Sequence, residues 1–152
     1  MDDDRSLVAR QIGREPRAFR RVVVRCPFGK PAVTEQAPFD GDGNPFPTTF
    51  WLTCPAAVAK VSRLEAAGGV ERWTVAAQED PQLAASLARA TAEQRALRPE
   101  LDVGIGGARD DAGSLKCLHA HVAFALARPG YELGELILAE LEPLFPESCC
   151  TT

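Results

Sequence analysis

The chain has 152 residues, of which 45% are hydrophobic and 25% charged, a composition typical of one globular domain with one core. It has neither a long apolar run nor the pattern of a secretory signal at its start, so we expect a cytoplasmic protein without membrane association. Its five cysteines are an odd number, and in a reducing compartment they are expected to remain thiols.

The net charge of -4 is distributed unevenly along the chain. Residues 5–30 carry eight Arg and Lys against one acid, whereas residues 31–152 carry nine against seventeen acids. Such a basic stretch can bind the phosphates of RNA, a nucleotide or polyphosphate. It can equally be solvated or paired with acids of the same fold. No DNA-binding motif accompanies it.

The first third of the chain predicts one helix, two short strands and an ordered loop. Asp4 is the expected cap of a helix that Gly13 ends. Residues 21–26 and 49–53 are rich in β-branched or aromatic side chains and predict strands. Residues 27–47 hold five prolines and three glycines, which predicts a long ordered loop between them.

The rest of the chain predicts four helices, each bounded by residues that cap or break helices. The first begins at Pro55 and ends at Gly68-Gly69, and the second begins at Pro81 after the cap Asp80 and ends at Pro99. The third runs from Leu115 to Ala127 after the cap Ser114. The fourth contains Leu133 and Leu141 and ends at Pro143. The sequence therefore predicts a single small α+β domain over 1–152, mainly helical with a short β element and the Pro-rich loop. Within it, we expect residues 1–19 to form a basic N-terminal helix and linker, and residues 143–152 to form a C-terminal tail.

The segment 116–121, Lys-Cys-Leu-His-Ala-His, holds both histidines and one cysteine at the start of a helix. A thiolate is stabilised at that end of a helix. Cys117 and His121 are one helical turn apart and can bind one ion together, while His119 falls nearer the leucine side.

Two further cysteines are candidates for the same site. Cys26 and Cys54 each follow an apolar strand and precede a proline, so the two strand ends can lie side by side near Cys117. Three sulfurs and one imidazole suit tetrahedral zinc or an iron–sulfur cluster. Free cysteine is also common in protein cores, so a purely structural role stays open.

Thiol catalysis is the other chemistry that these residue types support. Cys117 would be the nucleophile, His119 or His121 the base, and Arg25 the binder of an anionic substrate. Arg109 follows the Gly-rich turn 104–107 and can approach an anion there. Cys149 and Cys150 lie in the tail and are weaker candidates as ligands.

Four segments carry a family resemblance: RCPFGKPAVTEQAP (Arg25 to Pro38), PFPTTFWLTCP (Pro45 to Pro55), SRLEAAGGVE (Ser62 to Glu71) and KCLHAHVAFALA (Lys116 to Ala127). They resemble the bacterial, mostly actinobacterial proteins grouped as domain of unknown function 501. The resemblance implies that Cys26, Cys54, Cys117 and His119 belong to one site, which makes His119 a rival of His121 as fourth ligand. It implies no activity.

The sequence thus favours an uncharacterised cytoplasmic protein with a Cys/His metal site of the zinc or iron–sulfur type. Its expected ligands are Cys26, Cys54 and Cys117 with His121 or His119. A thiol-dependent enzyme that uses Cys117, and a small interaction module with a phosphate-binding N-terminal stretch, are the alternatives. The sequence does not decide whether the protein is an enzyme.

Overall fold

The computed structural model describes residues 3–107 and 115–149. Its elements confirm the predicted small α+β fold, with a three-stranded antiparallel sheet and six α-helices in the described part. In chain order they are α1 (Asp4–Ile12), β1 (Phe19–Arg25), β2 (Pro31–Gln36), β3 (Phe50–Leu52), α2 (Pro55–Ala66), α3 (Gly69–Glu79), α4 (Pro81–Leu97), a short 3-10 turn η1 (Ile105–Gly107), α5 (Leu118–Ala127) and α6 (Glu132–Leu141).

The sheet has the order β1-β2-β3, so β2 is its central strand. The prediction of a continuous loop over 27–47 is wrong here, because Pro31 begins this strand. Proline lacks an N–H but is tolerated at the first position of a strand. The residues that follow it are almost all buried, as expected for a strand with neighbours on both sides.

Strand β1 forms one edge of the sheet and pairs with β2 with several irregularities in register. Its burial pattern is mostly half-buried or exposed. Arg20 and Arg21 of β1 both form ion pairs with Glu35 on β2, at 3.2 and 2.9 Å. Part of the basic N-terminal stretch is thus paired with acids of the same fold.

The helix boundaries agree with the predicted caps at several ends. Asp80 caps α4 by accepting hydrogen bonds from Gln82 N and Leu83 N, and Pro81 is the first helical residue. The helix α3, by contrast, was not predicted from the sequence. Gly68, with φ 88°, follows the end of α2 and is the N-cap of α3. A Cβ at Gly69 would lie 2.7 Å from the Leu64 carbonyl oxygen. The Gly-Gly pair therefore joins two helices at close range.

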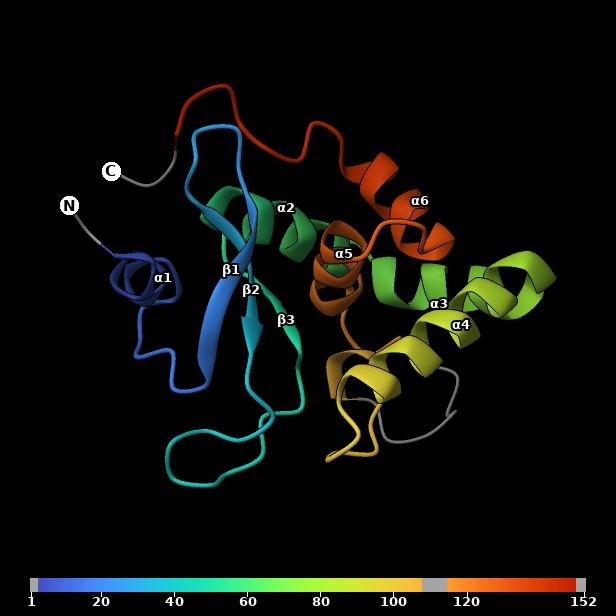
Figure 1. Cartoon of the computed structure of the whole chain (residues 1–152). Coiled ribbons are helices and arrows are strands. Elements are labelled where there is room, and N and C mark those ends of the chain that lie inside the picture. Colours follow the sequence, from blue (N-terminus) through green and yellow to red (C-terminus); the bar gives the residue numbers. More distant parts are fainter. Residues whose placement is uncertain (1–2, 108–114, 150–152) are drawn as a thin grey trace.

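Helix α5 is the centre of the molecule (Figure 1), between the sheet and the group formed by α3, α4 and α6. Almost every residue from Leu118 to Ala125 is buried. Phe124 makes edge contacts with the rings of Phe50 and Tyr131, and so joins the sheet to the start of α6.

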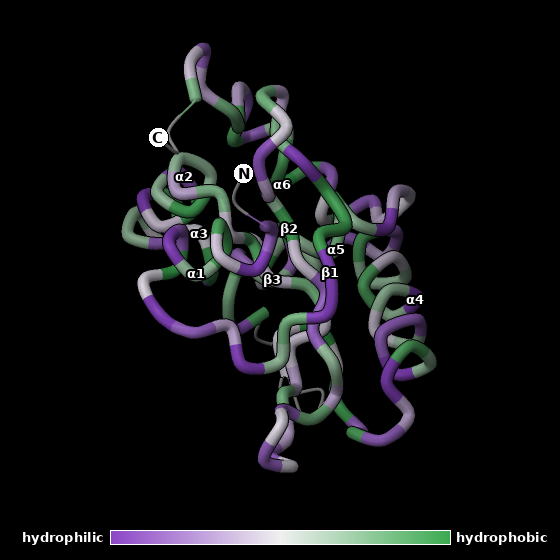
Figure 2. Tube along the Cα trace, turned by 60° about the vertical axis from the view of Figure 1, so that its left-hand side comes forward, coloured by the Kyte–Doolittle hydropathy of each residue, from purple (hydrophilic) through white to green (hydrophobic). Residues whose placement is uncertain are grey.

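The outer helices are amphipathic, unlike α5. Along α4, hydrophilic and hydrophobic segments alternate in Figure 2, as expected for a helix with one solvated face. No helix among the described residues has the length and apolar character needed to span a membrane.

Candidate functional site

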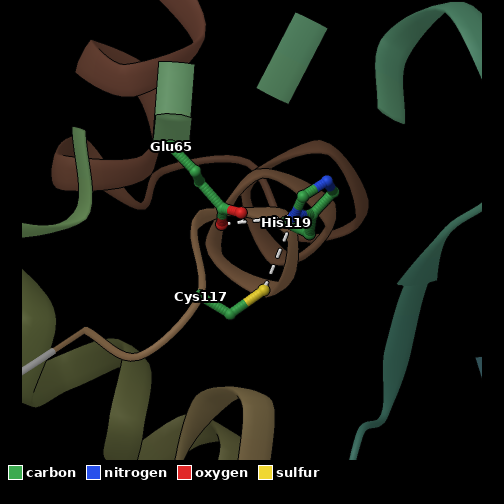
Figure 3. Close-up of side chains that lie close together, drawn as sticks. All are labelled: Glu65, Cys117 and His119. Carbon is green, nitrogen blue, oxygen red and sulfur yellow. Dashed lines mark hydrogen bonds and ion pairs between the residues drawn. The ribbon is translucent and has the colours of Figure 1, made fainter. Parts of the chain in front are cut away.

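Helices α2 and α5 bring three side chains with metal-binding atoms together (Figure 3). Glu65 comes from the last turn of α2, Cys117 precedes α5, and His119 lies in the first turn of α5. The His119 Nδ1 atom is 3.2 Å from Glu65 Oε2 and 3.6 Å from Cys117 Sγ. One ligand atom from each residue lies within 4.8 Å of the others, and all three residues are half-buried.

The other ring nitrogen of His119 faces α2. His119 Nε2 is 3.3 Å from the Val58 carbonyl oxygen and 3.2 Å from the Ser62 Oγ. Val58, Ser62 and Glu65 have i, i+4, i+7 spacing and therefore lie on one face of α2. This face contacts both ring nitrogens of His119. The ring orientation of His119 is therefore fixed from both sides.

Glu65 also caps α5. Its Oε2 accepts a hydrogen bond of 2.7 Å from Leu118 N, the first N–H of the helix. The N-cap residue Cys117 gives no side-chain cap, so the carboxylate of another helix takes that role. A negative charge is favourable at this positive end of the helix.

The backbone that leads into α5 is a tight turn of a rare kind. Cys117 N donates to the Leu115 carbonyl oxygen at 2.8 Å, and Lys116 between them has φ 67°. This is a γ-turn with positive φ, which is strained for a residue other than glycine. It turns Cys117 out of the helix, so the start of α5 lies three residues later than the predicted start at Leu115.

His121 holds that turn in place. Its Nε2 is 3.2 Å from the same Leu115 carbonyl oxygen, and its Nδ1 is 2.7 Å from the Tyr131 hydroxyl. A carbonyl only accepts, so Nε2 carries the proton and Tyr131 donates to Nδ1. Burial lowers the pKa of His121 to about 4, which keeps this ring neutral.

The pKa of His119 shifts in the opposite direction. The hydrogen bond with Cys117 raises it most, and the Glu65 carboxylate raises it further, against the opposing effect of burial. The Cys117 sulfur and the Glu65 carboxylate therefore favour a positive charge next to Nδ1 of His119, which either a proton or a metal ion can supply.

The structure gathers Cys117 and His119 of the expected ligands and adds Glu65, but separates the other two cysteines from them. β1 and β3 are parallel to each other on the two sides of β2, so Cys26 and Cys54 lie at the same end of the sheet. The central strand keeps their backbones apart by two strand spacings, about 10 Å. Within the described ranges, the 4.8 Å group contains neither of these sulfurs.

The surroundings of these sulfurs differ. Phe28 N donates to Cys26 Sγ at 3.4 Å in the turn after β1, whereas Cys54 is 2% exposed at the start of α2. His121, the preferred fourth ligand by helical spacing, is also outside the group, because Cys117 is not part of the helix and both His121 nitrogens have protein partners.

Of the two arginines predicted to bind an anion, Arg25 and Arg109, the structure describes Arg25, which is bonded to groups of the same chain. Arg25 forms an ion pair of 2.7 Å with Asp4 and donates to the Gly29 carbonyl oxygen. Arg109 and Cys150 lie outside the described residues, and Cys149 is half-buried after α6.

Glu65 was not predicted as a site residue from the sequence. It is the only acid among the residues of α2 and lies in the last turn of that helix. A lone carboxylate next to a buried face was the available signal.

Comparison with family models gives one match. A model described as Protein of unknown function (DUF501) matches residues 22–102, more than half of the chain. The matched range contains Glu65, Ser62 and Val58 and ends before Cys117. Comparisons with curated proteins and with solved structures give no match.

Proposed function

The chain belongs to the DUF501 family, and from this premise we propose that it is a metal protein in which Cys117, His119 and Glu65 bind one zinc ion. The observation that carries the proposal is the convergence of a thiol, an imidazole and a carboxylate within 4.8 Å. All three are ligand types that zinc prefers.

The distances between the ligand atoms agree with a tetrahedral ion. From ordinary Zn–S, Zn–N and Zn–O bond lengths, the S···N and N···O separations should be about 3.6 and 3.4 Å. The corresponding distances are 3.6 Å for Cys117 Sγ to His119 Nδ1 and 3.2 Å for His119 Nδ1 to Glu65 Oε2. Zinc would therefore need little rearrangement of these side chains.

The second ring nitrogen of His119 supports the same proposal. Histidines that bind metals commonly donate their other N–H to a backbone carbonyl or a carboxylate. The Val58 carbonyl oxygen beside Nε2 fits that pattern. With the proton on Nε2, the Nδ1 lone pair faces Cys117 and Glu65.

The ligand count favours mononuclear zinc over the iron–sulfur alternative. A cluster is normally held by four thiolates, whereas this group has one. Three protein ligands leave a fourth position for water, as in catalytic zinc sites. The proposal is thus a zinc site able to activate water or polarise a substrate oxygen, with the substrate class undefined.

The test is elemental analysis of protein purified without added metal or chelator, together with matched variants. We expect near-stoichiometric zinc in the wild type, and loss of most of it in Cys117→Ser, His119→Gln and Glu65→Gln. Glu65→Gln retains an acceptor for Leu118 N, so this loss is not a loss of the helix cap. Cys26→Ser is the control and should retain zinc. Retention in Cys117→Ser would contradict the proposal.

A second candidate function is thiol chemistry by Cys117. The pKa of His119 is raised, first by its hydrogen bond with Cys117, which favours a protonated imidazole beside this sulfur, and a neighbouring cation is typical of reactive cysteines. If the purified protein carries no metal, Cys117 should react with iodoacetamide faster than Cys26 near neutral pH, and His119→Gln should remove that advantage. Equal rates in wild type and variant would leave the thiol role without support.

A further inference from the structure

An apolar groove lies beside the C-terminal end of α6. Its volume is about 670 Å³, and it is lined by residues of α5, of α6 and of the segment that follows α6: Leu126, Leu138, Glu142, Pro143, Leu144 and Phe145. Leu126, Leu138 and Phe145 are half-buried and pack against the core. The groove therefore leaves part of their apolar surface in contact with water. It contains none of the three proposed zinc ligands.

The turn between β1 and β2 presents a phenylalanine to solvent. Phe28 is 40% exposed, and hydrogen bonds hold the backbone around it. Gly29 N donates to the Cys26 carbonyl oxygen at 2.9 Å, and Phe28 N donates to Cys26 Sγ at 3.4 Å. Arg25 donates to the Gly29 carbonyl oxygen at 3.0 Å. A ring on such a braced turn loses little conformational freedom on binding, so it is suited to insert into an apolar groove.

The groove and the turn carry opposite charges. Glu142 is exposed at the groove, and Lys30 stands at the end of the turn. Among the described residues, neither of these two side chains has an ion pair or a hydrogen bond. Arg25, by contrast, already forms an ion pair with Asp4. A Lys30–Glu142 pair between two copies of the chain is therefore available without the loss of an existing pair, and such complementary charges orient an interface.

Both features lie toward the same end of the molecule. In Figures 1 and 2 the turn after β1 and the segment after α6 are both at the top of the view. A two-fold interface uses the same surface of both copies. Two copies joined at this end can therefore each place the turn on the groove of the other, and every contact then occurs twice.

We propose that a second copy of this chain occupies the groove. In the resulting two-fold dimer, each copy inserts its Phe28 ring into the groove of the other and places Lys30 beside Glu142. Burial of the two rings supplies the attraction, and the two charge pairs fix the orientation. The contact uses the tip of the turn and not the backbone edge of β1. It is independent of the zinc site.

The test is the molar mass of the full chain by light scattering and sedimentation, over a series of concentrations up to about 1 mM. We expect an equilibrium of monomer and dimer. Phe28→Ser should raise the dissociation constant about ten-fold or more, because two buried rings are lost. Phe39→Ser is the matched control and should leave it unchanged. Phe39 is 41% exposed, but it lies in the loop between β2 and β3 at the opposite end of the molecule (Figure 1).

Exchange of the two charges tests which surfaces meet. Lys30→Glu and Glu142→Lys each place like charges at the contact and should weaken the dimer several-fold, whereas the double variant restores opposite charges and should recover most of the association. Melting temperatures near that of the wild type show that the variants fold. Additive weakening in the double variant, or a dimer that Phe28→Ser leaves unchanged, would overturn the proposal. A protein that is monomeric at about 1 mM would also overturn it and leave the groove to a different partner.

Discussion

Two histidines two residues apart have opposite roles because their surroundings differ. His119 is partly exposed and faces a thiol and a carboxylate, which raise its pKa. His121 is buried, neutral and bonded to the turn that positions Cys117. Burial also raises the pKa of Tyr131, which keeps its hydroxyl protonated as the donor to His121. His121 is therefore a positioning residue for the site.

This assignment predicts how stability depends on acidity. Between pH 6.5 and about 4, the unfolded chain binds a proton on His121 that the folded protein does not. The free energy of unfolding should therefore fall as pH decreases through this window, by up to roughly 3 kcal/mol from this group. Urea unfolding at a series of pH values measures it.

His121→Gln is the informative variant, because its amide can replace both hydrogen bonds but does not titrate. The fall in stability between pH 6.5 and about 4 should become smaller. His119→Gln is the control and should keep the fall, because a raised pKa contributes stability that is lost only as pH rises. An unchanged fall in His121→Gln would show that other groups cause it.

Among the helices, the contact of α5 with α6 depends on a glycine. A Cβ at Gly134 would lie 2.6 Å from the Cβ of Ala125 and 2.7 Å from the Tyr131 ring. Alanine is normally the better helix former by about 1 kcal/mol. The overlap nevertheless makes Gly134→Ala destabilising, by about 1–3 kcal/mol, since this packing has no free space.

Thermal and urea unfolding of Gly134→Ala measure this effect. Adding Ala125→Gly should restore part of the lost stability, because it removes the nearest atom. If Gly134→Ala alone melts at or above the wild-type temperature, α5 and α6 can move apart without loss of stability, and the prediction is wrong.

Local signals predicted the elements better than the site. Asp80 and Pro81 mark the start of α4 because capping and proline geometry involve neighbouring residues. β2 was not predicted, because its strand character depends on burial between two other strands. The prolines of the segment 27–47 suggested a loop instead. Glu65 and His119 meet only through the packing of α2 against α5, which no spacing within one segment encodes.

For the whole molecule, the proposed zinc ion would bridge α2 to the central helix. An ion that binds only the folded state stabilises it by mass action, by about 2.7 kcal/mol when free zinc is one hundred times the dissociation constant. Removing metal with a chelator should therefore lower the melting temperature, and added zinc should restore it. Cys117→Ser should show neither change, and an equal response in that variant would place the stabilising ion elsewhere.

The open edge of the sheet gives the basic residues of β1 a further consequence. An unpaired edge strand offers its backbone N–H and C=O groups to any other extended chain, which is a route to aggregation. The ion-paired arginines and the register irregularities of β1 oppose such pairing, because another chain would have to bury charged side chains and would meet a distorted hydrogen-bonding edge. The arginines of β1 thus oppose aggregation of this chain with its own copies, whether or not they also bind a ligand.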